Sequence, residues 1–292
     1  MNLSLYITSV LITTFSFAFI SIIGRGILRK SKKNISFKVF IPLYLIFAAI
    51  VAFALSYFLT GSIFVPLWYF PVILGLGVLY TVATYIMFYS LENELAALIG
   101  TINSTQALIL AFFSAVLFLQ FELVKATIAI LIMIVGIVML SSNDIRKGKF
   151  SKYVFLALFA NLLWVFMWLI FYGTIPSTVS PMTVYGWIAV FAFLASIPIL
   201  VSEKQKASYF VSVFKQKRQR NYILSAGVLS GLGSVLYSYS YVLNGVLTPI
   251  IVETEVFIIL VMAYFLLKER FKAIQLAGAL IVVFAVFVFL LL

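Results

Sequence analysis

The feature that most constrains this chain is a series of long apolar runs separated by short basic or turn-forming segments. A membrane-spanning helix needs about 20 mostly apolar residues, and unbroken runs of this length lack the alternation of a barrel strand. Because only helices and closed barrels satisfy all backbone hydrogen bonds inside lipid, the runs predict an all-α integral membrane protein. Ten transmembrane helices are expected, near residues 4–24, 37–59, 67–90, 95–119, 125–141, 153–173, 182–201, 221–242, 246–267 and 273–292.

The composition agrees with this class and removes many kinds of chemistry. Of the 292 residues, 65% are hydrophobic and 10% are charged, whereas soluble domains contain about 25% charged residues. The chain has no Cys and no His, which excludes disulfides, imidazole bases and the usual zinc and haem ligands. It has no G-K-S or G-K-T phosphate loop, so ATP is not its energy source. We therefore expect no metal, no cofactor and no catalytic residue, and the missing acid–base groups disfavour an enzyme that acts on lipid.

The basic residues predict the orientation in the membrane. All 20 Lys and Arg residues except Lys125 fall in four loops, which follow the first, fifth, seventh and ninth predicted spans. These loops share one face, and the positive-inside rule makes that face cytoplasmic. Both termini are then outside, and the plasma membrane is the simplest location for the protein. The basic residues that give the net charge of +12 are thus expected to contact membrane lipids and no nucleic acid. Aromatic residues beside the uncharged outer turns predict an interfacial belt of Trp68, Tyr69, Tyr185 and Trp187.

The ten spans divide into two sets of five, residues 1–146 and 147–292. Glu122 and Glu269 mark corresponding acidic turns before the last span of each half. Because each half has an odd number of spans, the second half enters the membrane inverted relative to the first. Inverted five-helix repeats are typical of secondary transporters, in which the substrate binds near the midplane between the halves. We therefore expect alternating-access transport of a small solute, and a passive channel is the alternative.

The segment 255–279 resembles the closing motif of EamA-type ten-helix members of the drug/metabolite transporter superfamily, which reads approximately E-P-V-F, an apolar run, G-E-R and then L-Q-x-x-G. Matching residues occur at Glu255, Glu269, Arg270, Gln275 and Gly278. The chain departs from the motif at Val256, where the family usually has Pro, and at Lys268, where it usually has Gly. The resemblance implies export or import of a metabolite such as an amino acid, sugar, nucleotide derivative or drug.

Glu253 and Glu255 are the acidic residues that lie deep inside a predicted span. A carboxylate at this depth costs about 2.5 to 3.5 kcal/mol, and no basic residue of the chain lies at the same depth. This cost must be compensated by protonation of the carboxylate, by a wet cavity or by a cationic group of the substrate. We expect one of them, with Glu255 preferred through the family motif, to bind an ammonium group or to exchange a proton, which favours amino acids or related amine-bearing solutes. The alternative is a protonated Glu that is hydrogen-bonded in helix packing.

Further polar and aromatic residues lie on the faces of other spans. Asn103 and Gln106 share one face of the fourth span, with Gln106 corresponding to Glu253 in the repeat. They either hydrogen-bond the polar end of the substrate or join helices. Aromatic and amide side chains of three other spans either line a cavity or pack in the core. These are Asn161, Trp164, Trp168, Tyr85, Tyr237 and Tyr241.

Two smaller patterns concern packing and the loops. The eighth span contains two interleaved pairs of small residues four apart, which predict close helix packing and a place where the halves slide during gating. The four residues are Gly227, Ser230, Gly231 and Ser234. In the turn before the last span, we expect Glu269 and Arg270 to form an ion pair in solvent.

Overall fold

The computed structural model describes residues 3–28, 35–103, 105–118, 123–140, 151–202, 213–243, 247–252 and 254–291. These residues form helices and connecting turns, without any strand. Six helices are long and apolar enough to cross a membrane, as predicted. They are α1 (Leu3–Leu28), α2 (Phe37–Thr60), α3 (Phe70–Asn93, preceded by the turn η1, Leu67–Tyr69), α8 (Lys152–Thr174), α9 (Pro181–Ser202) and α11 (Lys217–Leu243). The 24 residues of α2 span about 36 Å at 1.5 Å per residue, which exceeds the ~30 Å of a hydrocarbon core.

The other four predicted spans coincide with shorter helices. The fifth and tenth are α6 (Leu123–Leu140) and α14 (Ala273–Leu291). The fourth is divided into α4 (Ala96–Asn103) and α5 (Gln106–Phe118), and the ninth into α12 (Leu247–Val252) and α13 (Glu255–Leu266). The expectation of continuous helices there was wrong, because both segments turn at a polar sequence. The count of ten spans stays a prediction.

Local sequence signals explain several helix ends. Ser36 and Ser151 precede α2 and α8, and their hydroxyl oxygens accept hydrogen bonds from the backbone N–H of Lys38 and Tyr153, both at 3.3 Å. These bonds satisfy N–H groups that a helix start leaves without a partner. At the other end of α2, Gly61 has φ 69°, a left-handed conformation that glycine adopts without steric cost.

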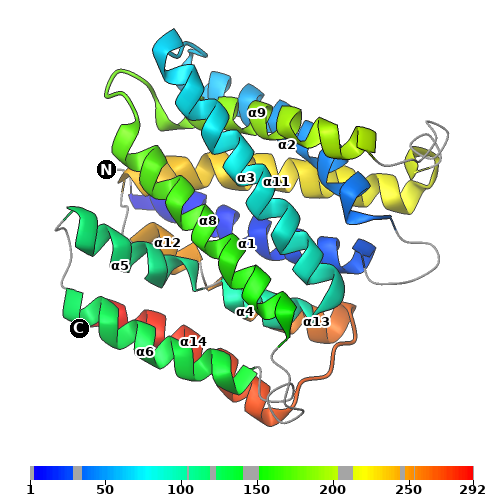
Figure 1. Cartoon of the computed structure of the whole chain (residues 1–292), viewed down its shortest axis with the longest axis vertical. Helices are drawn as coiled ribbons and strands as arrows, with labels where there is room; N and C mark the ends of the chain where they lie inside the picture. The colour runs from blue at the N-terminus through cyan, green and yellow to red at the C-terminus, as the bar shows by residue number, and fades with distance from the viewer. Residues whose placement is uncertain are drawn as a thin grey trace.

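The helices pack in pairs that join distant parts of the chain (Figure 1). α11 packs against both α1 and α2, and α3 packs in the same way against α8 and α9. α2 packs along α9, and α6 packs along α14. The buried side chains form two hydrophobic clusters. One contains residues near the α1 C-terminus and the α2 N-terminus, and the other contains residues near the α1 N-terminus and the start of α3.

The ends of the helices are sorted between two sides of the bundle. The N and C marks of Figure 1 lie on its left side. The end of α1, the start of α2, the end of α13 and the start of α14 lie toward its right side. These ends flank two of the basic loops that the sequence places on one face.

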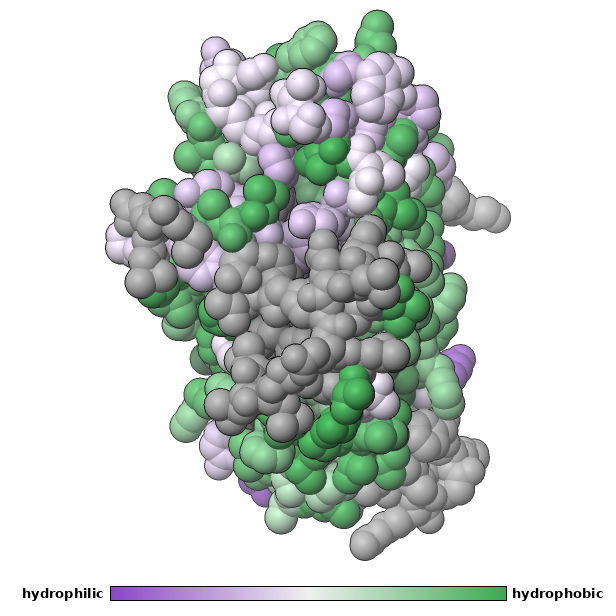
Figure 2. Space-filling model, turned by 90° about the vertical axis from the view of Figure 1, so that its left-hand side faces the viewer, coloured by the Kyte–Doolittle hydropathy of each residue, from purple (hydrophilic) through white to green (hydrophobic). Residues whose placement is uncertain are grey.

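The surface of the bundle is rich in large apolar side chains. Phe58, Leu67 and Phe265 are 81%, 85% and 70% exposed, and green apolar residues occupy much of the described surface in Figure 2. A soluble protein of this size rarely exposes apolar patches above a few hundred Å². This surface therefore fits hydrocarbon as its surroundings.

The small residues of α11 are divided between two environments. A Cβ atom built at Gly227 would lie 2.8 Å from the carbonyl oxygen of Tyr44, and one at Gly231 would lie 2.6 Å from that of Ala48. Both glycines therefore permit close contact with α2. Ser230 and Ser234 instead line the cavity described below.

We expect Gly231→Ala to destabilise the protein by about 1 to 3 kcal/mol, as overpacking of a tight contact usually does. The added methyl group meets the backbone of α2, which cannot move as a flexible side chain can. Thermal unfolding in detergent measures the effect. Gly75→Ala in α3 is the matched control, because a Cβ atom there meets nothing within 4 Å. Equal unfolding midpoints for the two variants would contradict the close contact.

Candidate functional site

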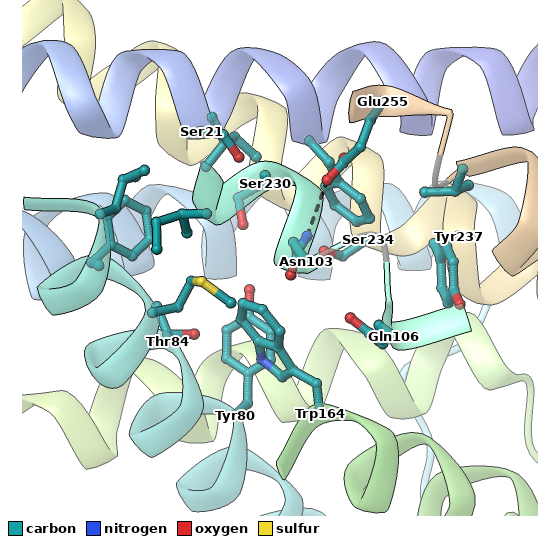
Figure 3. Close-up of a pocket in the computed structure, with 18 of the residues that line it drawn as sticks. Ser21, Tyr80, Thr84, Asn103, Gln106, Trp164, Ser230, Ser234, Tyr237 and Glu255 are labelled. Carbon is teal, nitrogen blue, oxygen red and sulfur yellow. Dashed lines mark hydrogen bonds between the residues drawn. The ribbon is translucent and has the colours of Figure 1, made fainter. Parts of the chain in front are cut away.

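A cavity of about 130 Å³ lies inside the bundle and touches residues of both hydrophobic clusters (Figure 3). Its walls come from α1, α2, α3, α4 and α5 and also from α8, α9, α11, α12 and α13. Both predicted halves thus contribute to it. The residues predicted from the sequence that line it are Asn103, Gln106, Trp164, Trp168, Ser230, Ser234, Tyr237 and Glu255.

Other predicted residues lie outside the lining of the cavity. Tyr85 packs edge-on against Phe37 with ring centroids 6.1 Å apart. Tyr241 stacks on Tyr237 from behind, with centroids 5.8 Å apart. Glu253 lies outside the described residues.

Each divided span turns at a threonine. The backbone N–H of Thr105 donates to the carbonyl oxygen of Ile102 at 3.0 Å, and its hydroxyl donates to the same oxygen at 2.7 Å. Thr254 makes the same two bonds to Ile251, at 3.1 and 2.7 Å. A bond to the third preceding residue tightens the backbone and ends the regular α-helical pattern. The fourth and ninth predicted spans therefore contain the same kind of turn.

If the two predicted halves are repeats, this turn gives a register between them. Gln106 follows Thr105 and begins α5, and Glu255 follows Thr254 and begins α13. In this register Gln106 corresponds to Glu255, two positions after the Glu253 with which the sequence paired it; the pairing stays a prediction. The apolar sequences around the turns do not show which residues of the two predicted halves correspond, whereas the turns do.

Glu255 and Asn103 meet across the cavity wall (Figure 3). The Nδ2 of Asn103 donates to Oε1 of Glu255 at 3.0 Å, and Glu255 is 1% exposed. The other oxygens of the pair, Oδ1 of Asn103 and Oε2 of Glu255, are buried without a hydrogen-bond partner among the described residues. In the first turn of α13, a carboxylate also interacts favourably with the positive end of the helix dipole. The pair therefore presents two acceptor oxygens that remain to be satisfied.

Asn161 of α8 holds the first turn in place without lining the cavity. It is fully buried, and its Nδ2 donates to the carbonyl oxygen of Ile102 at 2.5 Å and to Oγ1 of Thr105 at 3.2 Å. The amide thus connects α8 to the end of α4, where Asn103 is located. We infer that Asn161 is a positioning residue.

Asn161→Leu is expected to lower stability by about 1 to 3 kcal/mol, because it leaves buried polar groups with fewer partners. It should also weaken ligand binding, since Asn103 loses its support. Thermal unfolding with and without ligand measures both effects. Asn93→Leu is the control, because among the described residues the Asn93 Nδ2 bonds only the carbonyl oxygen of Tyr89 in its own helix. An Asn161→Leu protein as stable as the wild type would contradict this role.

An aromatic cluster of Trp168, Tyr185 and Tyr237 forms one wall of the cavity. The Trp168 ring lies 4.7 Å from that of Tyr237 and stacks on that of Tyr185 at 6.1 Å, with an interplanar angle of 11°. The prediction that Tyr185 belongs to an interfacial belt was wrong, because this residue is 3% exposed and lines the cavity. Trp68 is 68% exposed, as an interfacial residue would be. Nε1 of Trp164 is buried without a partner among the described residues.

A buried ion pair lies at one end of the bundle. Nε of Arg25 is 3.3 Å from Oε1 of Glu269, and their side chains are 11% and 4% exposed. The expected ion pair between Glu269 and Arg270 was wrong, because Glu269 points into the protein whereas Arg270 is exposed. Sequence reasoning missed this partner because Arg25 is 244 residues away and resembles the other basic residues of its loop.

The ion pair also binds backbone groups of the α3–α4 connection. Nη1 of Arg25 donates to the carbonyl oxygens of Leu91 and Glu92 at 2.8 and 2.7 Å. Oε1 of Glu269 accepts from the backbone N–H of Ala96 at 3.2 Å. Three separate segments, the end of α1, the α3–α4 connection and the α13–α14 connection, are thus tied together at this end.

Comparison with known proteins agrees with a transporter. Residues 151–291 match the EamA-like transporter family. No curated protein sequence matches the chain. A solved structure described as "Crystal structure of protein" is similar with a TM-score of 0.69 and 15% identity, over 97% of this chain and 98% of that one. This likeness shows a shared fold. The family match over residues 151–291, together with the helices that are long and apolar enough to cross a membrane, supports an integral, multi-pass membrane transporter of the EamA type in the drug/metabolite transporter superfamily.

Proposed function

We propose that the protein is a secondary transporter of small amine-bearing organic solutes, which works by alternating access around the cavity. The observation that carries the proposal is the place of the unsatisfied acceptors of Asn103 and Glu255. They lie at the ends of broken helices inside a cavity built from both halves. Broken helices at such a site are typical of secondary transporters, since their ends present charge and unpaired backbone groups to the solute.

The packing of the helices supports two inverted halves, residues 1–146 and 147–292. If the halves are exchanged, the contact of α1 with α11 becomes that of α8 with α3, and the contact of α2 with α11 becomes that of α9 with α3. All four contacts are present. The pairs α2–α9 and α6–α14 each become themselves under the exchange, and both are present. A bundle with this symmetry can close at either end by equivalent movements.

The ion pair of Arg25 and Glu269 supports one closed end. Arg25 ends the first helix of one half, and Glu269 lies before the last helix of the other. The positive-inside rule assigns this end to the cytoplasm, because it carries the basic loops. We propose that the ion pair closes the cytoplasmic path from the cavity and that both termini lie outside a plasma membrane. Separation of Arg25 from Glu269 would then accompany opening toward the cytoplasm.

Flux into liposomes that contain the purified protein tests the function. A transporter should show saturable uptake of a labelled amine or amino acid, and unlabelled solute inside the liposomes should accelerate uptake by exchange. A passive channel, the second candidate, gives flux that neither saturates nor exchanges. Proton coupling is read from a pH-sensitive dye in the same liposomes. Non-saturating flux without exchange would overturn alternating access.

A further inference from the structure

We propose that the cavity selects a monovalent amine cation that carries one flat ring and no carboxylate. This inference rests on the proposed transport function and narrows the class of solute. It is argued from three properties of the lining: the kind of hydrogen-bonding groups left unpaired, the charges present, and the shape of the apolar wall.

The first property is the pair of unpartnered acceptors beside the acid; an unpartnered donor of the described lining, Nε1 of Trp164, belongs to α8. Asn103 uses one N–H of its Nδ2 on Glu255, and its carbonyl oxygen lacks a partner among the described residues. Glu255 offers Oε2, which also lacks a partner among the described residues. An ammonium group has N–H donors in several directions and no acceptor, so it can bind both oxygens at once. A hydroxyl group has a single donor and satisfies one of them.

The second property is the absence of a positive side chain in the described lining. Glu255 is the charged residue among the described lining residues, and no Lys or Arg joins it. Arg25 lies outside the lining and is already bound to Glu269 and two carbonyl oxygens. The positive end of α5 offers about half an elementary charge, which does not neutralise the full negative charge of a carboxylate. An amino-acid zwitterion would therefore bury its carboxylate without a counterion, whereas its ester or the simple amine would not.

The third property is the size and shape of the space. The volume of about 130 Å³ is similar to that of an engineered apolar cavity of ~150 Å³ that holds one benzene molecule. The aromatic cluster of Trp168, Tyr185 and Tyr237 gives flat surfaces, on which a ring stacks and near which a cation is attracted. Trp164 adds a further ring from α8 (Figure 3). One ring with a short amine-bearing arm fills this space.

Four matched probes test the inference on the purified full-length protein at pH 7: 2-phenylethylamine, phenylalanine, phenylalanine methyl ester and 2-phenylethanol. They share the ring and differ in the ammonium and carboxylate groups. Titration calorimetry gives each dissociation constant, and thermal shift confirms binding by mass action. We expect the amine and the ester to bind at least about tenfold more tightly than phenylalanine and than the alcohol, because each weaker probe loses a charge-assisted bond or buries an unpaired charge.

Two variants test whether the preference for the amine depends on Glu255. Glu255→Gln should abolish the preference for the amine over the alcohol. Glu94→Gln, which makes the same chemical change outside the cavity lining, should retain it. If Glu255→Gln does not fold, the comparison of the four probes on the wild-type protein still decides the matter. Phenylalanine or the alcohol binding as tightly as the amine, or none of the four binding, overturns the inference.

The outcomes separate this inference from the transport proposal. Tight binding of phenylalanine with saturable, exchanging flux would leave a transporter and overturn the exclusion of carboxylates. Selective binding of the amine without any flux of it across liposomes would sustain the inference and overturn the transport proposal.

Discussion

Glu255→Gln is expected to lower the rate of uptake into liposomes by about 10- to 100-fold at low solute concentration, which corresponds to ~1.5 to 3 kcal/mol for a hydrogen bond to a charged group. The substitution preserves the size of the side chain and its ability to accept from Asn103. It removes the negative charge that a cationic solute or a proton would meet in the cavity. Initial rates at equal amounts of reconstituted protein measure the loss.

The matched control for this prediction is Asp144→Asn. It removes one carboxylate from the loop that the sequence places between the fifth and sixth predicted spans, and uptake should remain near the wild-type rate. Unaltered uptake by a folded Glu255→Gln protein would show that the acid only packs, which is the alternative that the sequence left open.

Arg25→Met is expected to destabilise the protein by about 3 to 5 kcal/mol, the usual cost of removing one member of a buried ion pair. The carboxylate of Glu269 would remain buried without its partner, and the carbonyl oxygens of Leu91 and Glu92 would lose a donor. The midpoint of thermal unfolding in detergent should fall by many degrees.

A double variant separates the loss of the ion pair from the burial of a lone charge. Arg25→Met combined with Glu269→Met should recover much of the lost stability, because two apolar residues of similar volume often replace a buried ion pair at little cost. Arg270→Met is the control at an exposed neighbour and should unfold like the wild type. A single Arg25→Met variant with the wild-type midpoint would rule out an energetic role for the pair.

The sequence was sufficient for the six long helices and for part of the site. Runs of apolar residues predicted the six long helices directly, because hydrocarbon permits few backbone arrangements. Asn103 and Glu255 were both singled out as polar residues inside apolar segments. That they bond each other across 152 positions was beyond prediction, because spacing along one helix says nothing about which helix lies opposite.

The rest of the site depends on packing between distant segments. Tyr44 and Tyr80 line the cavity, yet among 16 Tyr residues nothing in their local sequence distinguishes them. Tyr185 lies one turn after Pro181, where α9 begins, and both an interfacial and an inward position fit that spacing. The adjacency of Glu269 and Arg270 suggested a pair that burial of Glu269 against Arg25 prevents.

Thr105 and Thr254 make the same turn, and the helices that follow these turns begin with side chains that differ in one terminal atom. Gln106 begins α5 and Glu255 begins α13, and the two side chains differ only in having an amide nitrogen in one and a second oxygen in the other. Because both residues line the cavity, a solute with one cationic end would meet a carboxylate at α13 and a neutral amide at α5, and it would bind in one orientation. The orientation of the bound solute would then depend on a single functional group, the carboxylate of Glu255.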